Sequence, residues 1–300
     1  MSSVVKIFLL TSSLLALLTL LLIGPSQRQA TAARWSVAVY PAILRPGDVA
    51  RIELTPTTEF SSATLLWQEQ LIPLSPLPNG QLAVLIGIPR DMAAGIHQGK
   101  LQFTTRRGLH RSLLVKLPVE KKTFPEQHLS LPPQQVSPDQ KTMERHRRER
   151  VELNRVFDHP QQASLWEAPF QLPVQGKLLS PFGVQRILNG QPRSYHSGVD
   201  QRARLGEPVA TAGGGLVVLV ADHFFAGKSI YIDHGMGIIT MYFHLSSIHV
   251  NVGEEVAAGQ TIGLAGATGR ASGPHLHWGA RVHNCKVDPL ALLRVLEGPP

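Results

Sequence analysis

The sequence predicts an all-β protein in which a charged helix joins two β domains. Short segments of alternating apolar and polar residues recur through residues 35–118, and further short apolar segments between glycine-rich turns recur through residues 215–280. Alternation with a period of two residues is typical of strands with one buried face. The longest stretch with a helical pattern, residues 141–157, lies between these two regions.

The length and composition are those of a globular protein with more than one domain. The 300 residues exceed the length of one average domain, and the apolar fraction of 43% is well above that of a disordered chain. The single cysteine, Cys285, excludes an intrachain disulfide and a cysteine-rich zinc site, and we expect its thiol to be buried and inert. The net charge of +8 favours anionic partners such as nucleic acid, phospholipid head groups or an acidic cell-wall polymer. The densest basic cluster, residues 145–150, is interpreted first as the solvated face of a helix.

Residues 1–33 are predicted to be a signal peptide or a membrane anchor. Lys6 precedes an apolar run from residue 7 to residue 23, and Ala30-Thr31-Ala32 provides the small residues that signal peptidase favours. A cleaved export signal is the preferred interpretation. An inner-membrane anchor is the alternative, because the run is at the lower limit of what spans a hydrocarbon layer of ~30 Å. Both place the remainder of the chain outside the cytoplasm, in the periplasm or cell envelope.

Residues 34–118 are predicted to form an immunoglobulin-like β-sandwich. Turns such as Arg45-Pro-Gly-Asp48 and Leu77-Pro-Asn-Gly80 separate the expected strands. These strands are residues 36–40, 50–54, 63–67, 81–86, 99–104 and 112–117. No cluster of titratable residues stands out there, so the domain is interpreted as a binding, spacing or regulatory module.

Residues 119–164 are predicted to be a linker followed by the charged helix. Residues 118–138 are rich in Pro and Gln and show no periodicity, which is typical of a linker. Ser137-Pro138-Asp139 resembles a helix start. The helix over residues 141–157 is expected to connect or brace the two domains.

Residues 165–295 are predicted to form an antiparallel β domain. The expected strands are residues 215–220, 229–233, 238–243, 261–264 and 276–280, and a helical pattern returns only at residues 289–293. The glycine runs at 213–215 and 266–269 lack the Gly-Lys-Ser/Thr ending of a phosphate-binding loop and open no helix, so we interpret them as tight turns. A nucleotide is therefore not expected as a ligand. No nucleic acid is expected as a partner. His234, within Asp233-His-Gly, is assigned to a turn.

Four histidines and one carboxylate in this domain have the spacing of a metal site. His275 and His277 are separated by one residue in a strand-like setting, so they point to the same side of the backbone. An earlier fragment offers His196 and Asp200, and a third offers His244. Imidazole nitrogen and carboxylate oxygen are ligands that zinc accepts, and a catalytic zinc has three protein ligands and an open fourth position. We interpret His196, Asp200 and His277 as Zn2+ ligands, and His244 and His275 as groups that transfer protons.

The order of these fragments resembles a known family. The fragments His196-x-Gly-x-Asp200, Tyr242-x-His244-Leu, Val252-Gly-x-x-Val256-x-x-Gly-Gln260-x-Ile-Gly263 and Gly273-Pro-His-Leu-His277 together are similar to the lysostaphin-type (LytM-like) zinc metallopeptidases of peptidoglycan. The similarity runs from about Phe170 to Leu292 and implies a C-terminal domain of the duplicated hybrid motif type. In that family the first His, the Asp and the last His bind zinc, which matches His196, Asp200 and His277. The two remaining histidines match His244 and His275, and Tyr242 is a further donor or a packed residue.

The resemblance implies an exported zinc endopeptidase that hydrolyses peptide cross-links of peptidoglycan during cell-wall remodelling. A periplasmic setting favours the D-alanyl to diaminopimelate cross-link over glycine bridges, by analogy with the family. The alternative is a non-catalytic peptidoglycan-binding or hydrolase-activating protein, which loss of a zinc ligand would favour, but all five positions keep competent side chains. A latent enzyme, covered by the N-terminal domain or by the helix, is a third interpretation. The sequence predicts no particular oligomeric state.

Overall fold

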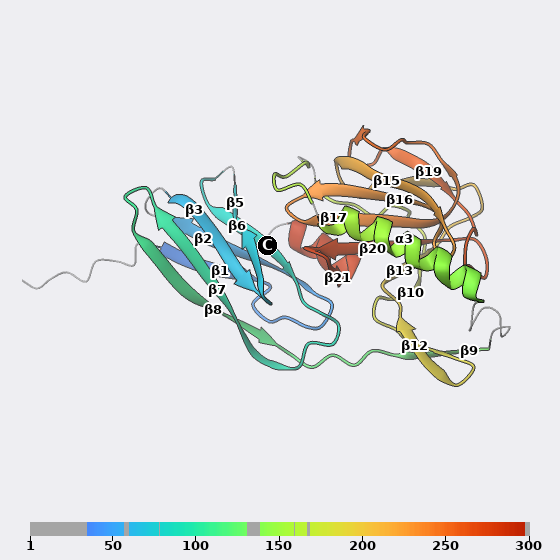
Figure 1. Ribbon diagram of the computed structural model, residues 1–300, viewed down its shortest axis with the longest axis horizontal. Coiled ribbons are helices and arrows are strands. Elements are labelled where there is room, and N and C mark those ends of the chain that lie inside the picture. Colours follow the sequence, from blue (N-terminus) through green and yellow to red (C-terminus); the bar gives the residue numbers. More distant parts are fainter. Residues whose placement is uncertain are drawn as a thin grey trace, which may run out of the picture. The chain divides into compact units, whose positions relative to one another are not determined.

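The computed structural model describes residues 35–56, 60–77, 79–130, 139–158, 160–166 and 169–297. Strands dominate this part of the chain, as predicted (Figure 1). The predicted signal or anchor at residues 1–33 lies outside the described residues. Among the helices that the structure describes, none has both the length and the apolar character needed to cross a membrane.

The N-terminal strands form two four-stranded sheets. One sheet has the order β1-β2-β6-β5 and the other has the order β4-β3-β7-β8. The strands are β1 (Trp35–Tyr40), β2 (Val49–Pro56), β3 (Phe60–Trp67), β4 (Gln70–Pro73), β5 (Ser75–Pro76), β6 (Leu82–Gly87), β7 (Gly95–Thr105) and β8 (His110–Val119). The six segments predicted as strands coincide with β1, β2, β3, β6, β7 and β8. The alternating pattern does not predict β4 and β5, which are short and are defined by their pairing with β3 and β6.

The segment expected to be a linker contributes a strand to a three-stranded sheet. β9 (Glu126–Leu129) pairs in parallel with β11 (Gln185–Leu188), and β11 pairs antiparallel with β12 (Gln191–Tyr195). Backbone hydrogen bonds define such a strand, and no apolar pattern is required. This part of the predicted linker is therefore structured.

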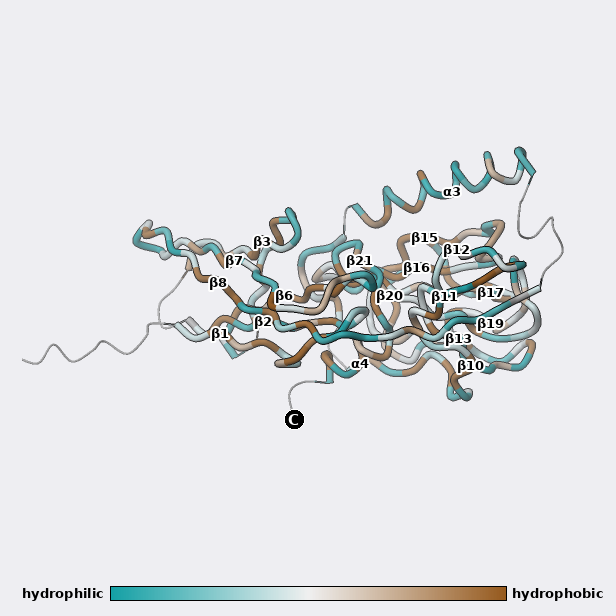
Figure 2. The backbone as a smooth tube through the Cα atoms, turned by 90° about the horizontal axis from the view of Figure 1, so that it is seen from below, coloured by the Kyte–Doolittle hydropathy of each residue, from teal (hydrophilic) through white to brown (hydrophobic). Residues whose placement is uncertain are grey.

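Helix α3 (Gln140–Asp158) confirms the predicted charged helix. Asp139 caps its start, because a carboxylate oxygen accepts the backbone N–H of Thr142 at 2.7 Å. Most of the helix is hydrophilic, with isolated apolar positions (Figure 2). Phe157 is buried in a small apolar cluster on the C-terminal sheet, whose other members are Leu219, Tyr231, Ile239 and Met241. The last turn of the helix is thus held to that sheet.

The C-terminal strands form one ten-stranded sheet. Its main path has the order β10-β13-β20-β17-β16-β15-β18, while β19 pairs with β17 and β14, and β21 pairs with β20. The strands are β10 (Leu178–Ser180), β13 (Gly198–Arg202), β14 (Pro208–Ala210), β15 (Gly215–His223), β16 (Gly227–Gly235), β17 (Ile238–Ile248), β18 (Glu255–Val256), β19 (Thr261–Ala265), β20 (His275–Val282) and β21 (Cys285–Val287). The five predicted strands lie in β15, β16, β17, β19 and β20, and the predicted C-terminal helix is α4 (Pro289–Leu296).

Two side chains of this domain acquire defined roles from their surroundings. Tyr242 is fully buried, and its hydroxyl accepts the backbone N–H of Ala212 at 2.8 Å and lies 2.9 Å from Thr240 Oγ1. Tyr242 is therefore a packed residue whose hydroxyl has its hydrogen-bond partners inside the core.

Cys285 is half-buried, and burial raises the pKa of its thiol to about 11, which agrees with the expected inert thiol.

His234 is buried at the end of β16 and is bonded on both sides of its ring. Its Nδ1 donates to the carbonyl of Gly214 at 2.7 Å, so Nε2 of the neutral ring accepts from the hydroxyl of Thr240 at 2.7 Å. Burial lowers the pKa of His234 to about 4. The residue predicted to serve a turn thus bridges segments inside the core.

We expect the free energy of unfolding to fall as the pH drops from 6.5 to about 4, because in this window the unfolded chain binds a proton at His234 and the folded chain does not. His234→Gln removes this titration, so its free energy of unfolding should depend less steeply on pH, whatever its stability at neutral pH. Chemical denaturation at several pH values within the window measures both slopes. Equal slopes for the wild type and the variant would contradict the assignment.

Candidate metal centre and neighbouring histidines

Strand pairing brings Asp200 and His277 face to face. Asp200 on β13 is the register partner of His277 on β20, so both side chains lie on the same face of the sheet. On the other side, Phe243 of β17 pairs with His277, and the two rings stack with centroids 5.2 Å apart. Gly198 permits the close approach of β13, because a Cβ there would collide with the carbonyl oxygen of Trp278 and lie 2.8 Å from His277 Nε2. Packing therefore requires the glycine of the His-x-Gly-x-Asp fragment.

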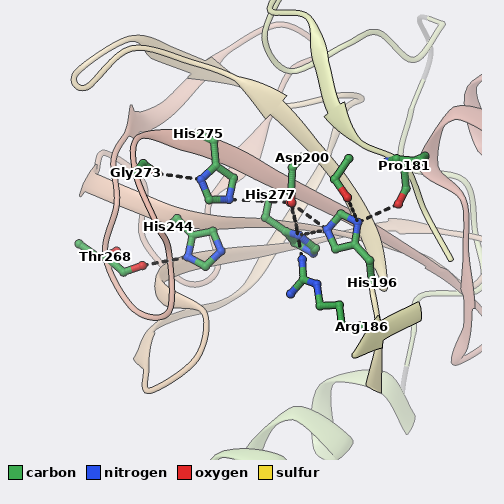
Figure 3. A network of polar contacts seen from close by, with 10 residues as sticks. Pro181, Arg186, His196, Asp200, His244, Thr268, Gly273, His275 and His277 are labelled. Carbon is green, nitrogen blue, oxygen red and sulfur yellow. Dashed lines mark hydrogen bonds and ion pairs between the residues drawn. The ribbon is translucent and has the colours of Figure 1, made fainter. Parts of the chain in front are cut away.

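His196 completes a cluster of three potential metal ligands (Figure 3). Its Nε2 lies 2.9 Å from Asp200 Oδ1 and 3.0 Å from His277 Nδ1, and His277 Nδ1 lies 2.8 Å from the same carboxylate oxygen. His196 Nδ1 donates to the carbonyl of Pro181 at 2.8 Å, so in the neutral ring Nε2 presents a lone pair. Two acceptors, His196 Nε2 and Asp200 Oδ1, then face each other, and a bound cation would relieve this contact. The donor set of two imidazole nitrogens and one carboxylate oxygen fits zinc.

His244 and His275 lie beside this cluster and are anchored in the same manner. Nδ1 of His244 lies 2.8 Å from the carbonyl oxygen of Thr268, and Nδ1 of His275 lies 2.8 Å from that of Gly273. Because a carbonyl only accepts, each Nδ1 carries a proton, and Nε2 of the neutral ring is then an acceptor. The two ring centroids are 4.8 Å apart, and His275 Nε2 lies 3.8 Å from Asp200 Oδ1. Figure 3 shows both rings on the same side of the ligand cluster.

The direction of the His244 side chain depends on an irregularity in β17. The register of β17 against β16 shifts between Ile230 and Lys228, opposite this position, and His244 has a left-handed φ of 63°. A bulge of this kind changes the direction of a side chain, and such a φ is uncommon for a residue other than glycine. His244 therefore lies in the site, whereas Tyr242, two residues earlier on the same strand, lies in the core.

Burial and mutual contacts set the charges of these groups. Burial alone would raise the pKa of Asp200, but the close contacts with the rings of His196 and His277 hold it well below its ordinary value. Burial, together with the neighbouring His277, lowers the pKa of His244 to about 4. Burial also lowers the pKa of His277. At neutral pH the site thus offers a carboxylate at Asp200 and neutral imidazoles at His244 and His277, which are the protonation states that metal binding and base catalysis require.

Two features near the site are not indicated by the sequence. Arg186 on β11 places a terminal nitrogen 3.6 Å from Asp200 Oδ2. The hairpin between β15 and β16 is held by α3, because a carboxylate oxygen of Glu149 accepts the backbone N–H of Phe224 at 3.0 Å. Both features depend on contacts between distant segments, and no motif marks them.

The site is typical of the metallopeptidase class. Two histidines and an aspartate converge on an antiparallel sheet, and two further histidines lie beside them. Residues 194–289 match Peptidase family M23. This part of the chain is therefore an M23 peptidase domain, and the match confirms the predicted lysostaphin-type family. All five predicted site residues lie within the matched range.

Curated relatives resemble part of the chain. The peptidoglycan DD-endopeptidase ShyA of Vibrio cholerae is 48% identical over 118 residues, which are 38% of this chain and 27% of that protein. The DD-carboxypeptidase/endopeptidase Mpg of Neisseria meningitidis is 34% identical over 119 residues, which are 40% of this chain and 27% of that protein. The chain thus spans about a quarter of the length of these relatives. A crystal structure assigned to peptidase M23 from Pseudomonas aeruginosa has a TM-score of 0.64 at 28% identity and covers 83% of this chain and 94% of that one.

Proposed function

We propose that this chain is an exported, zinc-dependent endopeptidase that hydrolyses peptide cross-links of peptidoglycan. The observation that carries the proposal is the convergence of His196 Nε2, Asp200 Oδ1 and His277 Nδ1 within an M23 peptidase domain. The relatives ShyA and Mpg are endopeptidases of the DD type. Their similarity supports a cross-link of the D-alanyl to diaminopimelate type as the substrate.

The roles of the five residues follow from their geometry. His196, Asp200 and His277 would hold the metal, and zinc bound there supplies Lewis acidity that polarises the amide carbonyl and acidifies water. His244 and His275 present Nε2 lone pairs beside the ligands. One of them accepts a proton from the attacking water, and a protonated ring returns a proton to the leaving amine. Both rings bond a backbone carbonyl through Nδ1 in the same way, so either histidine can accept the proton from water or donate one to the leaving amine.

The remaining parts of the chain receive supporting roles in this proposal. Residues 34–118, with their two four-stranded sheets, would form an immunoglobulin-like β-sandwich that positions or restrains the peptidase. Residues 119–164 would brace the two domains, and residues 165–295 would form the peptidase domain. Residues 1–33 would direct export and, if retained, anchor the protein to the inner membrane. The non-catalytic alternative is not favoured, because the site keeps three ligands and two proton-transfer histidines.

The purified full-length protein should contain about one zinc per chain, as a single three-ligand site implies. It should release soluble muropeptides from isolated peptidoglycan, and chelation should stop the release until Zn2+ is added back. Metal analysis and mass spectrometry of the fragments measure both results, and the fragment masses identify the bond that is cut. Zinc binding without fragments from any type of peptidoglycan would contradict the hydrolase proposal and leave the binding or activating alternative.

A further inference from the structure

Arg186 is a partly buried cation whose donors are largely unused. Its side chain is 27% exposed, and its Nε is buried without a hydrogen-bond partner among the described residues. Its ion pair with Asp200 Oδ2, at 3.6 Å, is too long to be a hydrogen bond. A guanidinium has five N–H donors, and buried donors without partners are rare. Arg186 therefore has donors available for an acceptor that the folded chain does not supply.

The guanidinium of Arg186 lies at the edge of the metal cluster and points toward it (Figure 3). Asp200 connects the two, because Oδ1 contacts His196 and His277 while Oδ2 faces Arg186. Only the carboxylate of Asp200 would thus separate a group bound to this guanidinium from the point where the ligands converge. Arg186 is on a strand paired on both sides, with β9 and with β12, so its position is fixed by regular structure.

A second guanidinium adds positive potential near Arg186. Arg270, between β19 and β20, lies over the ring of Phe225 with 4.4 Å to the ring centroid. Burial, and then the positive charge of Arg186, lower the pKa of Arg270. A buried cation whose charged form is disfavoured by a second cation favours an anion nearby.

The substrate of the proposed function carries an anion close to the scissile bond. In a cross-link from an acyl group to the D-centre of a diamino acid, the carbon bonded to the scissile nitrogen bears a free carboxylate. In a glycine bridge, the same carbon bears the next amide, which is neutral. Arginine binds a carboxylate through two parallel N–H···O bonds, so it can distinguish these two substrates.

We propose that Arg186 binds the free carboxylate on the amine side of the scissile amide and makes the site selective for cross-links that carry this anion. The inference rests on the proposed endopeptidase function and narrows its substrate. Arg186 is then a specificity-determining residue, whereas the ligands and His244 and His275 act at the amide itself.

The test compares two cross-linked peptide dimers that differ only in this group, which is a carboxylate in one and a carboxamide in the other. The wild type should hydrolyse the carboxylate dimer with a kcat/KM about 10- to 100-fold higher, the range expected for charge-assisted hydrogen bonds. Arg186→Gln should abolish the preference, so that its kcat/KM values for the carboxylate and carboxamide dimers become equal. Arg186→Lys should keep part of the preference, because it retains the charge without the planar fork.

Arg204→Gln is the matched control. It removes an exposed cation from the loop after β13 and should keep the full preference of the wild type. If the wild type hydrolyses neither dimer, the proposed function and this inference both fail. If it hydrolyses both dimers equally, the proposed function stands and the inference alone fails, even where Arg186→Gln does not fold. An equal loss of rate on both dimers in Arg186→Gln, accompanied by loss of zinc, would show that Arg186 only positions Asp200 and would overturn the inference.

Discussion

Asp200→Asn should abolish zinc binding and lower the rate of muropeptide release by at least about 10³-fold, since a catalytic metal contributes several kcal/mol to transition-state stabilisation. Asn has the shape of Asp without its charge. Asp200 Oδ1 contacts both His196 Nε2 and His277 Nδ1, so the carboxylate is the anionic member at the centre of the ligand set. The contacts with both rings hold its pKa well below the ordinary value against the effect of burial, so the carboxylate is charged at neutral pH.

The control for this substitution is Asp222→Asn. Asp222 is an exposed carboxylate near the end of β15 in the same domain, and its replacement should keep both the zinc content and the rate. Metal analysis of the purified variants and a muropeptide-release assay measure the two effects independently. Asp200→Asn with the zinc content of the wild type would show that the carboxylate is not a ligand.

Strands with their own apolar pattern could be predicted from the sequence, and strands defined by pairing could not. β15, β17 and β20 contain many buried apolar side chains, and each was expected. β13, by contrast, has the sequence Gly-Val-Asp-Gln-Arg, in which only Val199 is a large apolar residue. It forms because it pairs with β20 over its whole length, and Gly198 leaves room for this approach. β9 is a strand for the same kind of reason.

The convergence of the five candidate site residues could be predicted because they lie in compact motifs, but their orientation could not. The carbonyl groups of Pro181, Thr268 and Gly273 fix the tautomers of His196, His244 and His275. Any residue type can supply a carbonyl, so the sequence carries no trace of these contacts. The position of Arg186 beside Asp200 could not be predicted for a similar reason. Arg186 lies on β11, which pairs with β9, a strand about 60 residues earlier in the chain.

His244→Ala and His275→Ala should each lower kcat by about 10²- to 10⁴-fold and leave the zinc content at the level of the wild type. Both rings donate Nδ1–H to a backbone carbonyl, and Nε2 of each neutral ring is an acceptor beside the cluster. Each variant therefore lacks a proton-transfer group but keeps all three proposed metal ligands. Steady-state kinetics on a defined cross-linked peptide, with metal analysis of the same samples, measures both quantities. Loss of zinc in either variant would assign that histidine to the metal instead.

Tyr242→Phe separates this effect from a general disturbance of β17. Tyr242 lies two residues before His244, but its hydroxyl accepts the backbone N–H of Ala212 inside the core. The variant leaves that N–H unpaired, so the free energy of unfolding should fall by about 1–3 kcal/mol while kcat stays unchanged.

The double variant of His244 and His275 adds a further check. If both rings serve one proton-transfer sequence, its kcat should lie close to that of the more impaired single variant, because groups that act as a unit are not additive. Fully multiplicative losses would mean that the two histidines act independently.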